Sequence, residues 1–117
     1  MRLLEFLEWD EDKAAKNLKK HHVTFDDAAR VLADEEGGDF YHVDEFDELH
    51  ADDEDRYLTT ASDPDDRRIV MRISWTDRST HKRQIARIIS ARLATPRERK
   101  SYAQEVHRKS SDPQESL

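Results

Sequence analysis

A lysine, an asparagine and a histidine recur at helical spacing near the start of the 117-residue chain. Lys13, Asn17 and His21 are each four residues apart, so on a helix they would share one broad face. Histidine is the side chain that titrates closest to neutral pH, which suits it to proton transfer. A half-buried histidine near a helix end also interacts well with the last carbonyl groups. The spacing therefore indicates either an acid–base site or a satisfied helix terminus.

Arginines are the second set of residues that could do chemistry. Arg56 begins a predicted strand beside Tyr57, and Arg78 follows another predicted strand at a turn. The arginine fork binds phosphate oxygens in pairs and stays charged at any physiological pH. Arg56 is therefore either a phosphate contact or an ordinary charge on an edge strand, and Arg78 is placed where a long side chain could reach over a groove.

Two further arginines, Arg87 and Arg92, lie five residues apart on one predicted strand. Because side chains alternate between the faces of a strand, Arg87 would share a face with Ile89, and Arg92 would share the other with Ser90. Both could reach one phosphate only if a bulge or the strand end intervenes. The remaining basic residues of this region are expected on the solvated face of the sheet and hairpin; they are Arg68, Arg72, Lys82 and Arg83.

Metal chemistry has little support in the sequence. The chain has no cysteine, and its six histidines lack the spacing of known zinc motifs. The acidic run 52–55 lacks the glycine and the alternation of a calcium-binding loop. Glu98 is most simply the cap of a final helix and not a general base. We therefore expect no metal and no cofactor.

Length and composition indicate one small domain. Only 35% of the residues are apolar and 40% are charged, so the core must be small. The sequence contains no apolar run long enough to cross a membrane, and the first residues lack the continuous apolar region of a signal peptide. We expect a soluble, cytoplasmic protein without a membrane partner.

The net charge of −7 combines two opposite parts of the chain. Residues 1–55 carry a net −13, residues 56–109 a net +8 and residues 110–117 a net −2. Such asymmetry favours a nucleic-acid or partner surface built from the basic part. The acidic stretch 39–55 is either a solvated insertion, a shield over a basic groove, or a contact for the basic arm of a partner.

Capping and periodicity predict an α+β fold: β-α-α, then a three- to four-stranded antiparallel sheet and a C-terminal helix. The predicted elements are a strand over 4–9, a helix over 11–20 after Asp10, a helix from 25 after Thr24, a short strand near 40–43, strands over 56–61, 68–76 and 82–92, and a helix over 96–107 after Thr95. We expect a single domain over 1–108 and a polar, disordered tail over 109–117.

Several segments match a family pattern in order and spacing. They are Glu8-Trp9-Asp10, Lys13, Asn17 and Lys20-His21, then Asp55-Arg56-Tyr57 and Thr76-Asp77-Arg78, and then Arg87-Ile-Ile-Ser-Ala-Arg92 followed by Ala94-Thr95 and Glu98-Arg99. Together, over about residues 6–103, the chain resembles the BrnT family of type II toxins, ribonucleases of RelE-like fold. The family usually has glycine after the Lys-His pair, where this chain has His22.

The resemblance implies metal-independent cleavage of RNA, with the 2′-OH of the substrate as nucleophile, and inhibition of translation. It implies catalytic roles for His21, Arg56, Arg78 and Arg92, and substrate-binding roles for Lys13, Asn17, Lys20, Arg87 and Ser90. It also implies neutralisation by a ribbon-helix-helix antitoxin, expected in a heterotetramer, and operator DNA bound only through that antitoxin.

Two other functions remain open on the sequence alone. The first is a catalytically silent RelE-like binding module that acts in toxin–antitoxin complex formation and transcriptional autoregulation. The second is an acidic interaction protein whose first 55 residues imitate nucleic acid.

Overall fold

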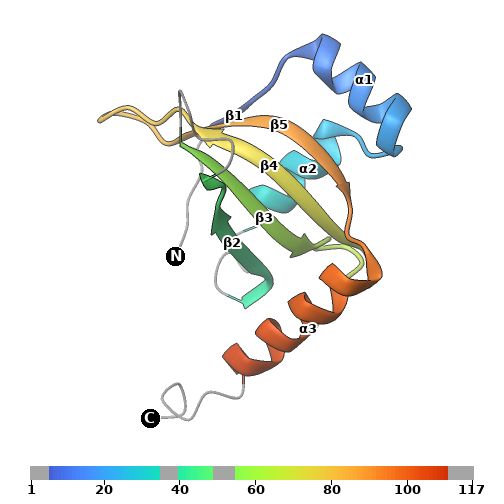
Figure 1. Cartoon of the computed structure of the whole chain (residues 1–117). Coiled ribbons are helices and arrows are strands. Elements are labelled where there is room, and N and C mark those ends of the chain that lie inside the picture. The colour runs from blue at the N-terminus through green and yellow to red at the C-terminus, as the bar shows by residue number, and fades with distance from the viewer. Residues whose placement is uncertain (1–5, 35–39, 49–54, 111–117) are drawn as a thin grey trace.

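The computed structural model describes residues 6–34, 40–48 and 55–110, and these residues form the α+β fold that the sequence predicts (Figure 1). In chain order the elements are β1 (Phe6–Glu8), α1 (Glu11–His21), α2 (Phe25–Leu32), β2 (His42–Phe46), β3 (Arg56–Ser62), β4 (Val70–Asp77), β5 (Ile85–Leu93) and α3 (Pro96–Ser110). The five strands form one sheet in the order β1-β5-β4-β3-β2. Helices α1 and α2 lie on one side of this sheet, and α3 crosses one end of the other side.

The sheet differs from the predicted one in size and in the direction of one strand. Strands β2 to β5 pair antiparallel, as predicted, but β1 joins β5 in parallel, with Phe6 opposite Ile85 and Glu8 opposite Arg87. The predicted antiparallel sheet is thus confirmed for β2 to β5, whereas the parallel pairing of β1 at its edge was not predicted. A three-residue strand carries too little pattern to identify a partner about 80 residues later in the chain.

The acidic stretch 39–55 holds one strand of the sheet. Strand β2 begins two residues after the predicted strand 40–43 and pairs with β3. Residues 39 and 49–54, which make up much of the predicted acidic loop, lie outside the described residues. The predicted shielding or partner-binding role of this stretch stays a prediction.

Side-chain caps begin α1 and α2 where the sequence predicts them. A carboxylate oxygen of Asp10 accepts the N–H groups of Asp12 at 2.8 Å and of Lys13 at 3.2 Å. The hydroxyl of Thr24 accepts the N–H of Asp27 at 3.1 Å. Each cap satisfies amide groups that have no partner inside the helix, which explains why both helices begin at these residues.

Helix α1 ends on a residue in the left-handed backbone conformation. His22 has φ of 60° and ψ of 27°, and its N–H donates to the Leu18 carbonyl at 2.8 Å. Glycine adopts this conformation freely, whereas a residue with a Cβ atom does so at a cost of about 1 kcal/mol. The position where the BrnT pattern usually has glycine is therefore one where the backbone favours it.

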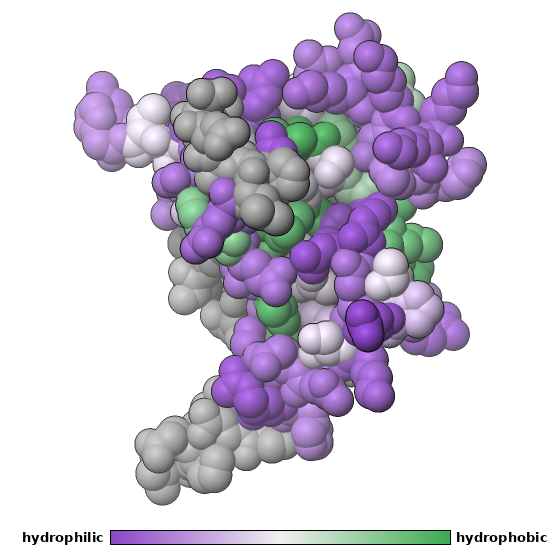
Figure 2. All heavy atoms as spheres, viewed as in Figure 1, coloured by the Kyte–Doolittle hydropathy of each residue, from purple (hydrophilic) through white to green (hydrophobic). Residues whose placement is uncertain are grey.

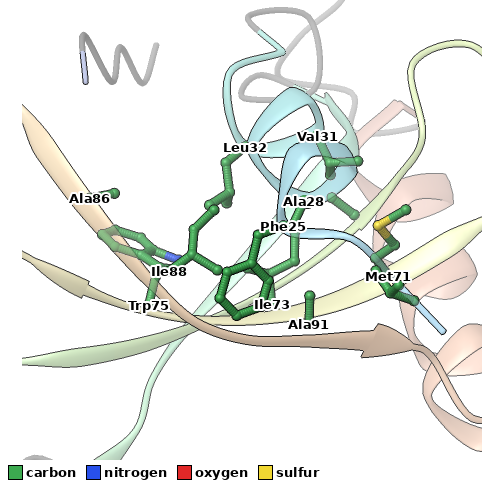
Figure 3. Packing of buried hydrophobic residues seen from close by; sticks show 12 residues of the cluster. Phe25, Ala28, Val31, Leu32, Met71, Ile73, Trp75, Ala86, Ile88 and Ala91 are labelled. Atoms are coloured by element: carbon green, nitrogen blue, oxygen red, sulfur yellow. The ribbon is translucent and has the colours of Figure 1, made fainter. Parts of the chain in front are cut away.

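The core lies between α2 and the helix-covered face of the sheet. Figure 3 shows Ala28, Val31 and Leu32 of α2 above Ile73 of β4 and Ile88 of β5, and each of these residues is at most 2% exposed. These three residues form the buried face of α2 together with Phe25. Burial of this face fixes α2 on the sheet, because apolar packing is the main stabilising contribution to such contacts.

Helix α3 is fixed across the sheet by one buried tyrosine. The Tyr102 hydroxyl donates to the Tyr41 carbonyl at 2.7 Å and accepts the Ser62 N–H at 3.1 Å. The helix continues to Ser110, past its predicted end at 107 and into the predicted tail. Residues 111–117 lie outside the described residues. Within the described part of the chain, no helix is both long enough and apolar enough to cross a membrane.

Candidate functional site

An irregularity in β5 determines which of its side chains share a face. Neighbouring residues of β4, Ser74 and Trp75, lie opposite Ser90 and Ile88 of β5 respectively. Ile89 is therefore one extra residue in β5, which is the definition of a β-bulge. Such a bulge resets the alternation of side chains between the two faces of the strand.

The reset places Arg87, Ser90 and Arg92 on the same face of the sheet. Ala86 and Ala91, which are both fully buried, mark the other face, under the helices. The sequence alone allowed Arg87 and Arg92 to act together only if a bulge or the strand end intervened, and the structure contains a bulge. Ile88 and Ala91 are three residues apart and both belong to the core under the helices, whereas residues three apart on a regular strand point to opposite faces.

We call the surface opposite the helices the arginine face, defined by Arg56, Arg72, Arg87 and Arg92. The strand register arranges these residues in two rows across the sheet. In the first row, Arg87 lies opposite Thr76, which lies opposite Arg56. In the second row, Arg92 lies opposite Arg72. Four cations from three strands thus face the same side.

The first row contains two buried polar atoms of particular interest. The buried Nε atom of Arg56 and the buried hydroxyl of Thr76 have no hydrogen-bond partner within the described residues. A buried polar atom left in this state costs about 1–3 kcal/mol, so such atoms are rare and often mark functional sites. In the same row, Arg87 lies 3.7 Å from a carboxylate oxygen of Glu8 on β1.

The start of α1 lies close enough to this row to be influenced by its charge. The pKa of Asp10 is lowered mainly by its hydrogen bonds from the N–H groups of Lys13 and Asp12, against a smaller opposing effect of burial. The positive charges of Lys13 and Arg87 lower this pKa further. Lys13 and Arg87 therefore act on the same carboxylate from two different elements.

The second row is organised by Glu98 of α3. Arg92 donates to both carboxylate oxygens of Glu98, at 2.7 and 2.9 Å, and Arg72 Nε lies 3.3 Å from one of them. Glu98 also forms the predicted capping box, because it accepts the Thr95 N–H at 2.9 Å while its own N–H donates to the Thr95 hydroxyl at 3.2 Å.

These contacts decide the ionisation of Glu98. The hydrogen bonds from Arg92, helped by the Thr95 N–H and the charges of Arg92 and Arg72, lower the pKa of Glu98 to about 2, although burial opposes them. The same pairing raises the pKa of Arg92. A carboxylate with so low a pKa is a weak proton acceptor at neutral pH, which agrees with a capping role rather than a general base.

Arg72 was predicted on the solvated face of the sheet, and this prediction was wrong. Its side chain is only 21% exposed, and it donates to the Thr60 hydroxyl at 3.0 Å and to a Glu45 carboxylate oxygen at 3.2 Å. With Glu98 it also lines a groove of about 470 Å³ between the sheet and α3. The alternation of Arg72 with buried Met71 and Ile73 placed it on one face, but α3, which covers that face, could not be positioned from the sequence.

Asn17 is buried, and its side-chain amide bonds to the backbone. It is 6% exposed, and its amide nitrogen donates to the carbonyl groups of Ala91 at 2.8 Å and of Val23 at 3.0 Å. Its amide oxygen accepts the Ala91 N–H at 3.1 Å. Asn17 therefore completes the edge of β5 beyond the end of β1, and these bonds argue against the predicted substrate contact.

The other predicted residues of α1 do not lie on the arginine face. Lys13 and Lys20 are exposed and His21 is half-buried, on a helix whose Ala14 packs against the core cluster. Arg78 is exposed at the base of the loop between β4 and β5, where its N–H donates to the Ile85 carbonyl at 2.9 Å. Of the nine predicted residues, the arginine face brings together Arg56, Arg87, Ser90 and Arg92.

Comparison with known families identifies the family to which the chain belongs. A family model described as "Ribonuclease toxin, BrnT, of type II toxin-antitoxin system" matches residues 9–98. The match runs from the residue before the Asp10 cap to Glu98 and includes all nine predicted site residues. A comparison with curated proteins finds no match. Because the family match spans well over half of the 117 residues, the chain belongs to the BrnT family of ribonuclease toxins of type II toxin–antitoxin systems.

Proposed function

We propose that this chain cleaves RNA on its arginine face, without a metal ion, and thereby inhibits translation in the cytoplasm. The observation that carries the proposal is the bulge in β5, which puts Arg87, Ser90 and Arg92 on the face that also holds Arg56. In the proposed reaction the 2′-OH of the RNA loses its proton and attacks the adjacent phosphorus. The 5′-oxygen leaves with a proton, and a 2′,3′-cyclic phosphate remains.

The first row of the arginine face is the proposed centre of this reaction. Arg56 and Arg87 are separated by two strand spacings, about 10 Å between backbones, so their long side chains can converge on one phosphate. Preorganised cations of this kind stabilise the charge that develops on the phosphorane oxygens. Arg56 Nε and the Thr76 hydroxyl, which have no partner within the described residues, support the assignment, because a bound phosphate would bring new acceptors to this row.

The remaining predicted residues receive secondary roles in the proposal. Arg92 is already neutralised by Glu98, so we rank it below Arg56 and Arg87 in catalysis. His21 does not lie on the arginine face, so its role in proton transfer is proposed on the resemblance to the BrnT family and on the suitability of histidine for this step. Binding of the RNA backbone at the rim is proposed for Lys13, Lys20 and Arg78, which are all exposed.

Family membership implies an antitoxin partner. We further propose that this antitoxin is a ribbon-helix-helix protein, that the two chains form a heterotetramer, and that operator DNA is bound only through the antitoxin. Support comes from the family description and from the acidic part of the chain, since residues 1–55, with a net charge of −13, suit a basic partner.

One observation favours the silent binding module as a second candidate. Glu98 lies within ion-pair distance of two of the four arginines that define the arginine face, Arg72 and Arg92. Ion pairs inside the site reduce the positive charge available to a phosphate. A chain that used this face only for packing would keep the same contacts.

The test is cleavage of single-stranded RNA by the purified chain in the presence of EDTA, with detection of the cyclic-phosphate end. We expect Arg56→Gln and Arg87→Gln each to lower the single-turnover rate by about 100-fold or more. The matched control is Arg68→Gln, an arginine that is 89% exposed and pairs with Asp66 in a turn outside the arginine face. It should cleave like the wild type.

Absence of cleavage by folded wild-type protein, together with absence of growth arrest on expression, would overturn the ribonuclease and leave the silent module. Equal losses in Arg68→Gln and Arg87→Gln would instead show that the arginine face is not the site. Rescue of growth by a co-expressed ribbon-helix-helix partner, with recovery of a two-chain complex, tests the proposed antitoxin class.

A further inference from the structure

An exposed aromatic ring lies at the end of the arginine face. Phe6 of β1 is 43% exposed and lies opposite Ile85 of β5, two residues before Arg87. Because side chains alternate along β1, Phe6 shares a face with Glu8, which pairs with Arg87, while Leu7 turns to the core. The ring is thus on the same face as the proposed catalytic row.

An arginine stacks on this ring. The guanidinium carbon of Arg83 lies 4.8 Å from the centroid of Phe6. Arg83 belongs to the loop 78–84 between β4 and β5, which projects beyond the end of the sheet (Figure 1) and is largely hydrophilic (Figure 2). All seven residues of this loop are exposed, and it contains Arg78, Lys82 and Arg83 but no Asp or Glu.

The loop holds Arg83 by its own hydrogen bonds. The Thr80 hydroxyl accepts the N–H groups of Lys82 and Arg83, both at 3.2 Å, and the Thr80 N–H donates to the Arg83 carbonyl at 2.9 Å. At its base, the Ser79 hydroxyl accepts the Ile85 N–H at 3.0 Å. The backbone of Arg83 is therefore positioned before any ligand arrives, which lowers the entropic cost of binding.

We infer that Phe6 and Arg83 form a stacking platform for one nucleobase of single-stranded RNA, beside the phosphate held by the arginine face. Bases stack on aromatic rings and on guanidinium planes, and exposed cations such as Lys82 attract the phosphate backbone. The Ile85 and Arg87 positions are about 7 Å apart along β5, so the platform would take a base adjacent to the bound phosphate. This inference rests on the proposed function and adds a base-binding subsite to it.

The test is binding of a short RNA that carries 2′-O-methyl groups, which prevent cleavage, and one 2-aminopurine, whose fluorescence falls when it stacks. Phe6→Leu is expected to weaken binding about 10-fold and to remove the quenching, whereas Phe6→Tyr should stay within about 2-fold of the wild type. The matched control is Phe46→Leu on β2, a phenylalanine that is 48% exposed and packs on Tyr57. It should bind like the wild type.

A second measurement uses only the wild-type chain, so it does not depend on the folding of a variant. An RNA in which the adjacent nucleotide is abasic should bind about 10-fold more weakly than the intact RNA. Equal affinity for abasic and intact RNA, or equal effects of Phe6→Leu and Phe46→Leu, would overturn the platform. If the wild type cleaves RNA and either of these two results is obtained, only this inference fails. If the wild type neither binds nor cleaves RNA, the proposed function fails as well.

Discussion

Glu98 performs two tasks with one carboxylate, since it caps α3 and holds Arg92 and Arg72. Folding lowers its pKa from 4.5 to about 2, chiefly through Arg92. A carboxylate whose pKa is lowered stabilises the folded state above its unfolded pKa and loses this effect as the pH falls through the folded value. The contribution of Glu98 should therefore be complete above about pH 4.5 and fade towards pH 2.

We predict that Glu98→Gln lowers the free energy of unfolding by about 2 kcal/mol at pH 7, because it removes charged hydrogen bonds in a partly buried site. The difference from the wild type should shrink at pH 3. Urea unfolding at both pH values measures it. Glu105→Gln is the control, because Glu105 lies on the same helix and pairs with Arg108 near solvent; its effect should be smaller. A difference that is the same at pH 7 and pH 3 would contradict the assigned ion pair.

His22 shows how one backbone angle can be tested by substitution. Its φ of 60° favours glycine, so His22→Gly should raise the free energy of unfolding by up to about 1 kcal/mol, despite the greater freedom of glycine in the unfolded chain. His22→Ala keeps a Cβ atom and should give no such gain. Thermal unfolding of the three proteins measures the order. Equal stabilities for the glycine and alanine variants would argue against strain at this helix end.

At the scale of elements, the contact between α1 and the edge of β5 depends on the Asn17 amide. Asn17→Ala should leave the Ala91 peptide groups without their partners and lower the free energy of unfolding by about 2–4 kcal/mol. Lys16→Ala, an exposed neighbour on the same helix, is the control. Hydrogen exchange gives a specific measurement, because the Ala91 amide proton should exchange faster in the Asn17 variant. Loss of RNA binding with unchanged stability would favour the substrate-contact alternative.

Local signals in the sequence predicted most elements, and long-range pairing explains what they missed. The caps at Asp10, Thr24 and Thr95 were correct because each depends on atoms within three residues. The parallel pairing of β1 with β5 was missed because it joins distant segments through three residues. The candidate arginines came from the family resemblance. The bulge that aligns Arg87 with Arg92 depends on packing against β4 and the helices, so the hydrophobic periodicity of β5 could not predict it.

At the scale of the whole molecule, the charge of −7 does not oppose RNA binding if the contacts are local. The net +8 of residues 56–109 includes all four arginines of the arginine face and the loop 78–84. Screening limits the reach of the acidic part to about 8–10 Å at physiological salt, so nearby cations dominate at the face. Glu98→Gln should therefore raise the affinity for RNA, because it frees positive charge on Arg92 and Arg72.

The salt dependence of binding tests whether RNA is held by local contacts between its phosphates and the arginine face. If about four phosphates are contacted, the logarithm of the association constant for uncleavable single-stranded RNA should fall with a slope of about −3 against the logarithm of the salt concentration. Arg87→Gln should reduce the magnitude of this slope by about 0.7, and the exposed control Arg68→Gln should leave it unchanged. Fluorescence anisotropy across a salt series measures all three proteins. A slope near zero would mean that RNA is not held through its phosphates, and equal slopes for the two variants would place the contacts away from the arginine face.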